Sequence, residues 1–125
     1  AYMPNLTTLD LSNFNTSQVT NMYFMFYNML NLTTLDLSNF DTSQVTIINF
    51  IFALSDYDKH NDKLEVIYVN NDFDTSKFVN TGNVFYNRKK LRGGNGSFLA
   101  DPSTADLSWL RVDRPGVQGY FTRKP

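Results

Sequence analysis

Two aspartates, Asp10 and Asp36, occupy equivalent places in two nearly identical segments, 26 residues apart. Hard cations such as Ca²⁺ prefer carboxylate oxygens but need about six to eight oxygen ligands, more than this pair and its neighbouring hydroxyls supply. Carboxylates about 5–9 Å apart also perform acid–base chemistry in glycosidases. That chemistry needs a cleft, whereas the surrounding pattern indicates a flat sheet. Two solvated aspartates are therefore the simpler interpretation.

A second group of possible metal ligands consists of Asp56, Asp58, His60 and Asp62. The Asp-x-Asp spacing resembles the start of a Ca²⁺-binding loop, but the glycine and the distant glutamate of such a loop are missing. His60 is the only histidine and the chain has no cysteine, which disfavours a hydrolytic triad and excludes a cysteine-based metal site. We predict that the chain is not an enzyme and holds no metal ion or other cofactor.

Both aspartates belong to a repeated unit of 26 residues. Residues 5–20 and 31–46 are identical at fifteen of sixteen positions; only Asn15 and Asp41 differ. A period in this range is typical of solenoids, in which each unit buries an apolar face against the next. We therefore expect the α/β fold class, as a right-handed β-α solenoid (leucine-rich repeat) of about three coils. The expected coils lie within residues 1–90 and span residues 5–30, 31–62 and 63–90.

Each unit begins with a pattern that predicts a strand. Leu9 and Leu11 alternate with polar residues, as in a strand with one buried face. The alternation recurs at residues 35–37 and, in a worn copy, at residues 64–69. A phenylalanine follows each strand, and we expect these rings to form an aromatic spine of Phe14, Phe40 and Phe73.

The second half of each unit predicts a short helix. Met22, Met25 and Phe26 share one face at helical spacing, and Thr20 is a suitable N-cap. The third unit starts six residues later than the 26-residue period requires, so we expect residues 55–62 to form an inserted polar loop.

The outward positions of the three strands should form one polar sheet face. Stacked strands lie about 4.8 Å apart, which aligns equivalent residues in rows. In the third copy Tyr68 replaces the repeated aspartate and offers an aromatic platform for a peptide or a sugar. The alternative interpretation is a solvated face whose Thr and Ser residues simply suit strands. The predicted ligand-binding residues are Thr8, Asp10, Ser12, Thr34, Asp36, Ser38, Val66, Tyr68 and Asn70.

Charge and composition change where the repeats end. Residues 1–87 hold three lysines against nine acidic residues, a net charge of −6, and residues 88–125 hold eight basic against three acidic residues, a net charge of +5. The basic residues are scattered, which disfavours nucleic acid as a partner. We predict that residues 91–125 form an irregular, β-rich C-terminal cap on the apolar end of the repeats. Its expected apolar anchors are Trp109, Tyr120 and Phe121.

The repeat has a specific family likeness. Residues 35–46 read Leu-Asp-Leu-Ser-Asn-Phe-Asp-Thr-Ser-Gln-Val-Thr, and residues 22–26 read Met-Tyr-Phe-Met-Phe. This combination resembles the BspA-type leucine-rich repeat of bacterial surface proteins. The ending is similar to the segment that closes such arrays in lactobacilli and related Gram-positive bacteria. The third copy and Ile47-Ile48 depart from the pattern, so the third strand is a poor copy of the family surface.

The resemblance implies a secreted adhesin of the bacterial cell wall, without catalytic residues. We expect a non-catalytic binding domain, extracellular at the cell surface, attached through regions outside these residues and forming a monomeric part of a larger protein. The expected partner is a host extracellular-matrix, epithelial or mucus protein or glycan. No membrane insertion is expected, since no apolar run reaches about 20 residues. The alternative function is a structural spacer that projects another domain from the cell wall.

Overall fold

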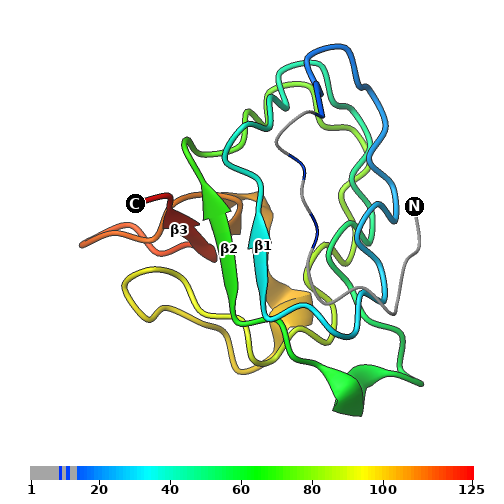
Figure 1. Ribbon diagram of the computed structural model, residues 1–125, viewed down its shortest axis with the longest axis vertical. Coiled ribbons are helices and arrows are strands. Elements are labelled where there is room, and N and C mark those ends of the chain that lie inside the picture. The colour runs from blue at the N-terminus through cyan, green and yellow to red at the C-terminus, as the bar shows by residue number, and fades with distance from the viewer. Residues whose placement is uncertain (1–8, 10, 12–13) are drawn as a thin grey trace.

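The computed structural model describes Leu9, Leu11 and residues 14–125. The three strands of this part form one parallel sheet in the order β1-β2-β3. Figure 1 shows this sheet on one side of the molecule and the stacked turns of successive repeats on the other. The elements, with η for a 3-10 helix, are β1 (Thr34–Asp36), η1 (Lys59–Asn61), β2 (Val66–Val69), η2 (Pro102–Thr104), η3 (Leu107–Trp109) and β3 (Phe121–Arg123).

The expected fold class, a right-handed β-α solenoid of leucine-rich-repeat coils, is wrong. The described residues contain no α-helix, and most of them lie in turns and irregular segments around the small sheet. Where a helix is predicted, the amides of Met22, Phe24 and Phe26 donate to carbonyl oxygens of the next repeat at 2.8–3.1 Å. An α-helix would instead direct these amides to carbonyls four residues earlier in its own segment.

Backbone conformation gives a second reason for the absence of helices. Phe24 and Phe50 occupy equivalent places in the first two repeats and have φ angles of 56° and 58°. Such left-handed residues do not occur inside right-handed helices. The spacing of Met22 and Phe26 therefore reflects burial in a series of turns, with both side chains inside the core.

The same backbone pairing joins the second repeat to the third. The amide of Ile48 donates to the carbonyl of Asn80 at 2.9 Å, and Phe52 donates to Val84 at 3.1 Å. Side chains reinforce the stacking: the buried Thr42 hydroxyl donates to the Asp74 carbonyl at 3.2 Å and accepts the Asp74 amide at 2.9 Å. The repeats are thus held in register at many points.

Aromatic rings form the centre of the core. The rings of Phe26, Phe52 and Phe85, one from each repeat, stack nearly parallel with centroids 5.8 and 5.5 Å apart. The expected spine is present only in part. Phe14 and Phe40 meet edge to face at 5.8 Å, while Phe73 packs on Phe121 at 4.8 Å.

Residues 91–125 share this core with the repeats. Trp109, Tyr120 and Phe121 are buried in the same hydrophobic cluster as the repeat residues. The turn at residues 93–97 is held by the Asp113 carboxylate, which accepts hydrogen bonds from the amides of Asn95 and Ser97 at 2.8 and 3.0 Å. A domain boundary at residue 90 stays a prediction.

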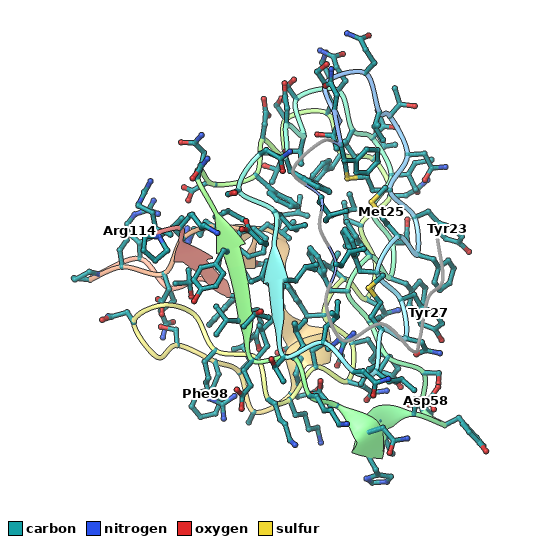
Figure 2. All side chains as sticks on the ribbon, in the orientation of Figure 1. Tyr23, Met25, Tyr27, Asp58, Phe98 and Arg114 are labelled. Carbon is teal, nitrogen blue, oxygen red and sulfur yellow. The ribbon has the colours of Figure 1, made fainter. Side chains whose placement is uncertain are left out.

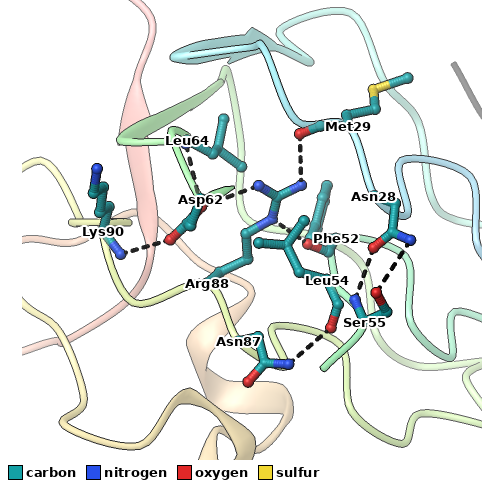
Figure 3. Close-up of polar contacts among 10 residues, drawn as sticks. All are labelled: Asn28, Met29, Phe52, Leu54, Ser55, Asp62, Leu64, Asn87, Arg88 and Lys90. Atoms are coloured by element: carbon teal, nitrogen blue, oxygen red, sulfur yellow. Dashed lines mark hydrogen bonds and ion pairs between the residues drawn. The ribbon is translucent and has the colours of Figure 1, made fainter. Parts of the chain in front are cut away.

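A buried arginine joins all three repeats (Figure 3). Arg88 is 1% exposed; its guanidinium donates to the Phe52 carbonyl at 2.6 Å and to the Met29 carbonyl at 3.2 Å. It also contacts the carboxylate of buried Asp62 at 3.1 Å. Burial lowers the pKa of Arg88 and the neighbouring carboxylate opposes this shift. Arginine is effectively always charged in proteins, so its contact with the Asp62 carboxylate is an ion pair.

We predict that Arg88→Met lowers the free energy of unfolding by about 3–5 kcal/mol, because it leaves the Asp62 carboxylate buried without its counter-charge. Urea denaturation measures the loss. The control is Lys90→Met at an exposed position, which should change stability by no more than about 0.5 kcal/mol. Adding Asp62→Asn to Arg88→Met should recover part of the loss. Equal effects of the arginine and lysine substitutions would contradict the role assigned to Arg88.

Candidate functional site

Four predicted site residues lie on two neighbouring strands. The register pairs Thr34 with Val66 and Asp36 with Tyr68. All four side chains are exposed or half-buried, while the residues between them point into the core. The structure therefore brings the carboxylate of β1 and the aromatic ring of β2 together in one row.

The other predicted residues lie at or beyond the strand ends. Ser38 and Asn70 follow β1 and β2 in the succeeding turns. The amide of Ser38 donates to Asp36 Oδ1 at 2.9 Å, so this residue orients the carboxylate through its backbone. The remaining three predictions fall outside the described residues: Thr8, Asp10 and Ser12.

The sequence interpretation assigned residues 91–125 to a β-rich cap and did not foresee that a strand of this segment, β3, extends the face. β3 pairs with β2 so that Thr122 lies opposite Tyr68 and Arg123 opposite Val69. Thr122 is half-buried and Arg123 exposed. The row that begins with Asp36 and Tyr68 thus continues into the last residues of the chain.

Lys124 lies across this row. Its ammonium forms an ion pair with Asp36 Oδ2 and stands 5.6 Å from the centroid of the Tyr68 ring, within the range of a cation–π contact. Its backbone amide donates to the Val69 carbonyl at 2.8 Å. The neighbouring Arg123 guanidinium donates to the Asn70 carbonyl at 2.8 Å. A basic segment is therefore bound along the end of β2.

The electrostatics of Asp36 reflect this contact. Burial raises the pKa of the Asp36 carboxyl, but hydrogen bonds from Lys124 and Ser38 lower it by more, so that the net pKa lies below its ordinary value of 3.8. The ion-pair side chains of Asp36 and Lys124 are 40% and 41% exposed. Solvent screens such a pair, which makes it weak and exchangeable.

A second ion pair stands at the same end of the sheet. Arg114 contacts both carboxylate oxygens of Asp72 at 3.1 Å, and Asp72 Oδ1 also accepts the Val112 amide at 2.8 Å. Figure 2 shows Arg114 on the side of the molecule that carries β3. Arg114 and Lys124 therefore neutralise carboxylates of the repeats. These two pairs bring together some of the opposite charges that the sequence separates into residues 1–87 and 88–125.

A shallow groove lies beyond the ends of the strands. It has a volume of about 220 Å³ and separates the turn after β1 from the turn after β2. The carboxylates of Asp41 and Asp74 also accept local amide hydrogen bonds from Ser43 and Ser76, at 2.9 and 3.0 Å. The lining residues are Phe40, Asp41, Thr42, Ser43, Asn71, Asp72, Phe73 and Asp74.

The acidic insertion does not assemble as a metal site. Asp56 accepts hydrogen bonds from the Tyr86 hydroxyl at 2.7 Å and the Asn87 amide at 3.1 Å, and Asp62 is paired with Arg88. In the part of the chain that the structure describes, no group of three or more His, Cys, Asp or Glu side chains is placed to hold a metal ion. Residues 55–62 are therefore tied to the third repeat rather than arranged around a cation.

Aromatic side chains also gather on the turn side of the molecule. Phe24 and Phe50 stack at 4.9 Å, with Tyr27 edge-on to Phe24 at 4.6 Å. Tyr23 is 52% exposed, and Figure 2 shows Tyr23 and Tyr27 on the side away from β3. Phe24 and Phe50 pack against each other across neighbouring repeats. This aromatic group is therefore part of the packing between repeats, unlike Tyr68 on the strand face.

We predict that the pKa of Asp36 rises when Lys124 is replaced by Gln. In the unchanged chain, NMR titration should give a value below 3.8. A lowered folded-state pKa stabilises the fold above the ordinary value, and this contribution is lost as the pH falls through the lowered pKa. The stability difference between the two chains should therefore disappear in acid. An unchanged Asp36 pKa in the Lys124→Gln chain would contradict the contact.

Comparisons with known proteins place the repeats in a family. Searches among curated proteins and among solved structures found no match. No helix in the described residues is long and apolar enough to cross a membrane. The family DUF285, described as a Mycoplasma protein of unknown function, matches residues 2–101, which include the repeats and both β1 and β2. The chain belongs to the DUF285 family.

Proposed function

We propose that this chain is a non-catalytic binding domain of a bacterial cell-surface adhesin. The ligand surface is the outward face of β1, β2 and β3. The observation that carries the proposal is the row of Asp36, Tyr68 and Thr122, in which a half-buried aromatic residue stands between a carboxylate and a hydroxyl. Aromatic rings with a few polar neighbours are common centres of recognition sites.

Family evidence supports a surface protein without naming its ligand. The chain belongs to DUF285, and its repeat resembles that of BspA-type surface proteins. Both are consistent with a repeat protein presented outside the cell. We propose that the domain lies at the extracellular surface of a bacterium, as part of a larger protein attached through other regions.

The chemistry of the face narrows the class of ligand. A flat row of Thr34, Asp36, Val66 and Tyr68 suits an extended or planar partner better than a small molecule enclosed in a cavity. Tyr68 supplies a stacking surface, and Asp36 with Thr122 supplies hydrogen-bonding groups. The proposed partner is a host extracellular-matrix, epithelial or mucus protein or glycan.

We predict that Tyr68→Ala weakens binding to the ligand by at least about tenfold, the loss typical of an aromatic residue at the centre of an interface. The ligand is identified on arrays of matrix proteins, mucins and glycans, and the affinity is then measured by surface plasmon resonance. The matched control is Tyr23→Ala, an exposed aromatic residue on the turn side, which should leave binding unchanged. Thermal unfolding monitored by circular dichroism verifies that both variants are folded.

Two results would overturn the assignment. Binding that survives Tyr68→Ala but is lost with Tyr23→Ala would move the site to the turn side. A folded chain that binds nothing above background on all arrays would favour the spacer function instead.

A further inference from the structure

We propose that Asp36 and Tyr68 form a site for the ammonium group of a lysine in a basic segment of a partner protein, and that Lys124 occupies this site within the chain. This inference rests on the proposed function, since it names the ligand class of the same face. It follows from a cation already bound there, not from exposure of the face alone.

The site has the two groups that recognise an alkylammonium ion. Asp36 Oδ2 pairs with the Lys124 ammonium, and Asp36 Oδ1 is held by the Ser38 amide at 2.9 Å. The Tyr68 ring lies 5.6 Å from the same ammonium. A carboxylate neutralises the charge, while a ring face attracts the cation and accepts contact from its methylene groups. A neutral or anionic side chain would gain neither interaction.

The backbone around Lys124 explains how this lysine reaches the site. Residues 121–123 form β3 in parallel register with β2, and the Lys124 amide continues this pairing at the Val69 carbonyl. Arg123 reaches the Asn70 carbonyl. Residues 121–124 therefore stay fixed along the end of β2 by their backbone. Only the Lys124 side chain has to leave for a partner lysine to enter.

Lys124 can be displaced because its contact is solvent-exposed. Its side chain is 41% exposed and that of Asp36 is 40% exposed, and exposed ion pairs contribute little to stability. β3 keeps its backbone pairing and its buried Phe121 when the lysine moves. The internal lysine then acts as a competitor that lowers the apparent affinity for an external one.

The groove beyond the strands favours a partner with several basic residues. Asp41, Asp72 and Asp74 line it, and Arg114 already neutralises Asp72. A segment that places one lysine at Asp36 and continues into the groove meets the carboxylates of Asp41 and Asp74. This charge complementarity selects a basic segment and rejects an acidic one.

The test measures binding of a peptide labelled with fluorescein at its N-terminal amine, fluorescein-Gly-Lys-Gly-Lys-Gly-amide, to the full chain by fluorescence anisotropy. Lys124→Gln should bind it about two- to sixfold more tightly than the unchanged chain, as expected for an internal competitor held by an exposed ion pair of up to about 1 kcal/mol. The control Lys90→Gln makes the same change of charge at an exposed position elsewhere and should bind like the unchanged chain. A peptide with both lysines acetylated should not bind.

Two further variants localise the effect. Adding Asp36→Asn or Tyr68→Leu to Lys124→Gln should abolish the gain in affinity. If either double variant fails to fold, NMR of the Tyr68 ring in the Lys124→Gln chain replaces it, and the ring signals should shift as the peptide is added.

The inference is overturned if Lys124→Gln binds no more tightly than Lys90→Gln, if the acetylated peptide binds equally well, or if the Tyr68 signals do not move. Failure here leaves the proposed function standing when an array ligand still requires Tyr68. Failure of both experiments removes the strand face as a binding site.

Discussion

Backbone hydrogen bonding between successive repeats is the constraint on which the structure depends. It joins Phe26 to Ile51 at 2.8 Å and Phe52 to Val84 at 3.1 Å on the turn side, and Leu37 to Tyr68 at 2.8 Å beside the sheet. Because a buried backbone amide needs a partner, each repeat must lie in one register on the next. That register stacks the phenylalanine rings and aligns the outward strand residues. The insertion at residues 55–62 leaves this register intact because it projects between the paired segments.

The stacking of the repeats leaves backbone carbonyl oxygens inside the core, and Arg88 donates hydrogen bonds to two of them. It donates to carbonyls of the first and second repeats and pairs with Asp62 at the end of the insertion. Residues far apart in the chain thus share one charged centre. The ion pairs at the other end, Asp72 with Arg114 and Asp36 with Lys124, are exposed. The buried pair therefore serves stability, whereas the exposed pairs are screened by solvent and contribute less.

Sequence patterns predict some features of this molecule and miss others for identifiable reasons. Alternation places Leu35 and Ile67 inward and Asp36 and Tyr68 outward, because a strand has a period of two. The helix prediction fails because a series of turns buries Met22 and Phe26 at the same spacing that a helix would. The positive φ of Phe24 and Phe50 carries no sequence signal, since a phenylalanine is unusual there.

The candidate site is predictable only in part. The partnership of Asp36 with Tyr68 follows from the repeat, but that of Asp36 with Lys124 joins residues 88 positions apart. Nothing local in the sequence identifies that pair; only the opposite net charges of the repeats and the last residues suggest it.

Scalar couplings across hydrogen bonds, detected by NMR, test the register most directly because they identify the carbonyl that each amide contacts. We expect the Leu37 amide to couple to the Tyr68 carbonyl and the Phe52 amide to the Val84 carbonyl; coupling of Phe52 to Ile48, as in an α-helix, would contradict this register.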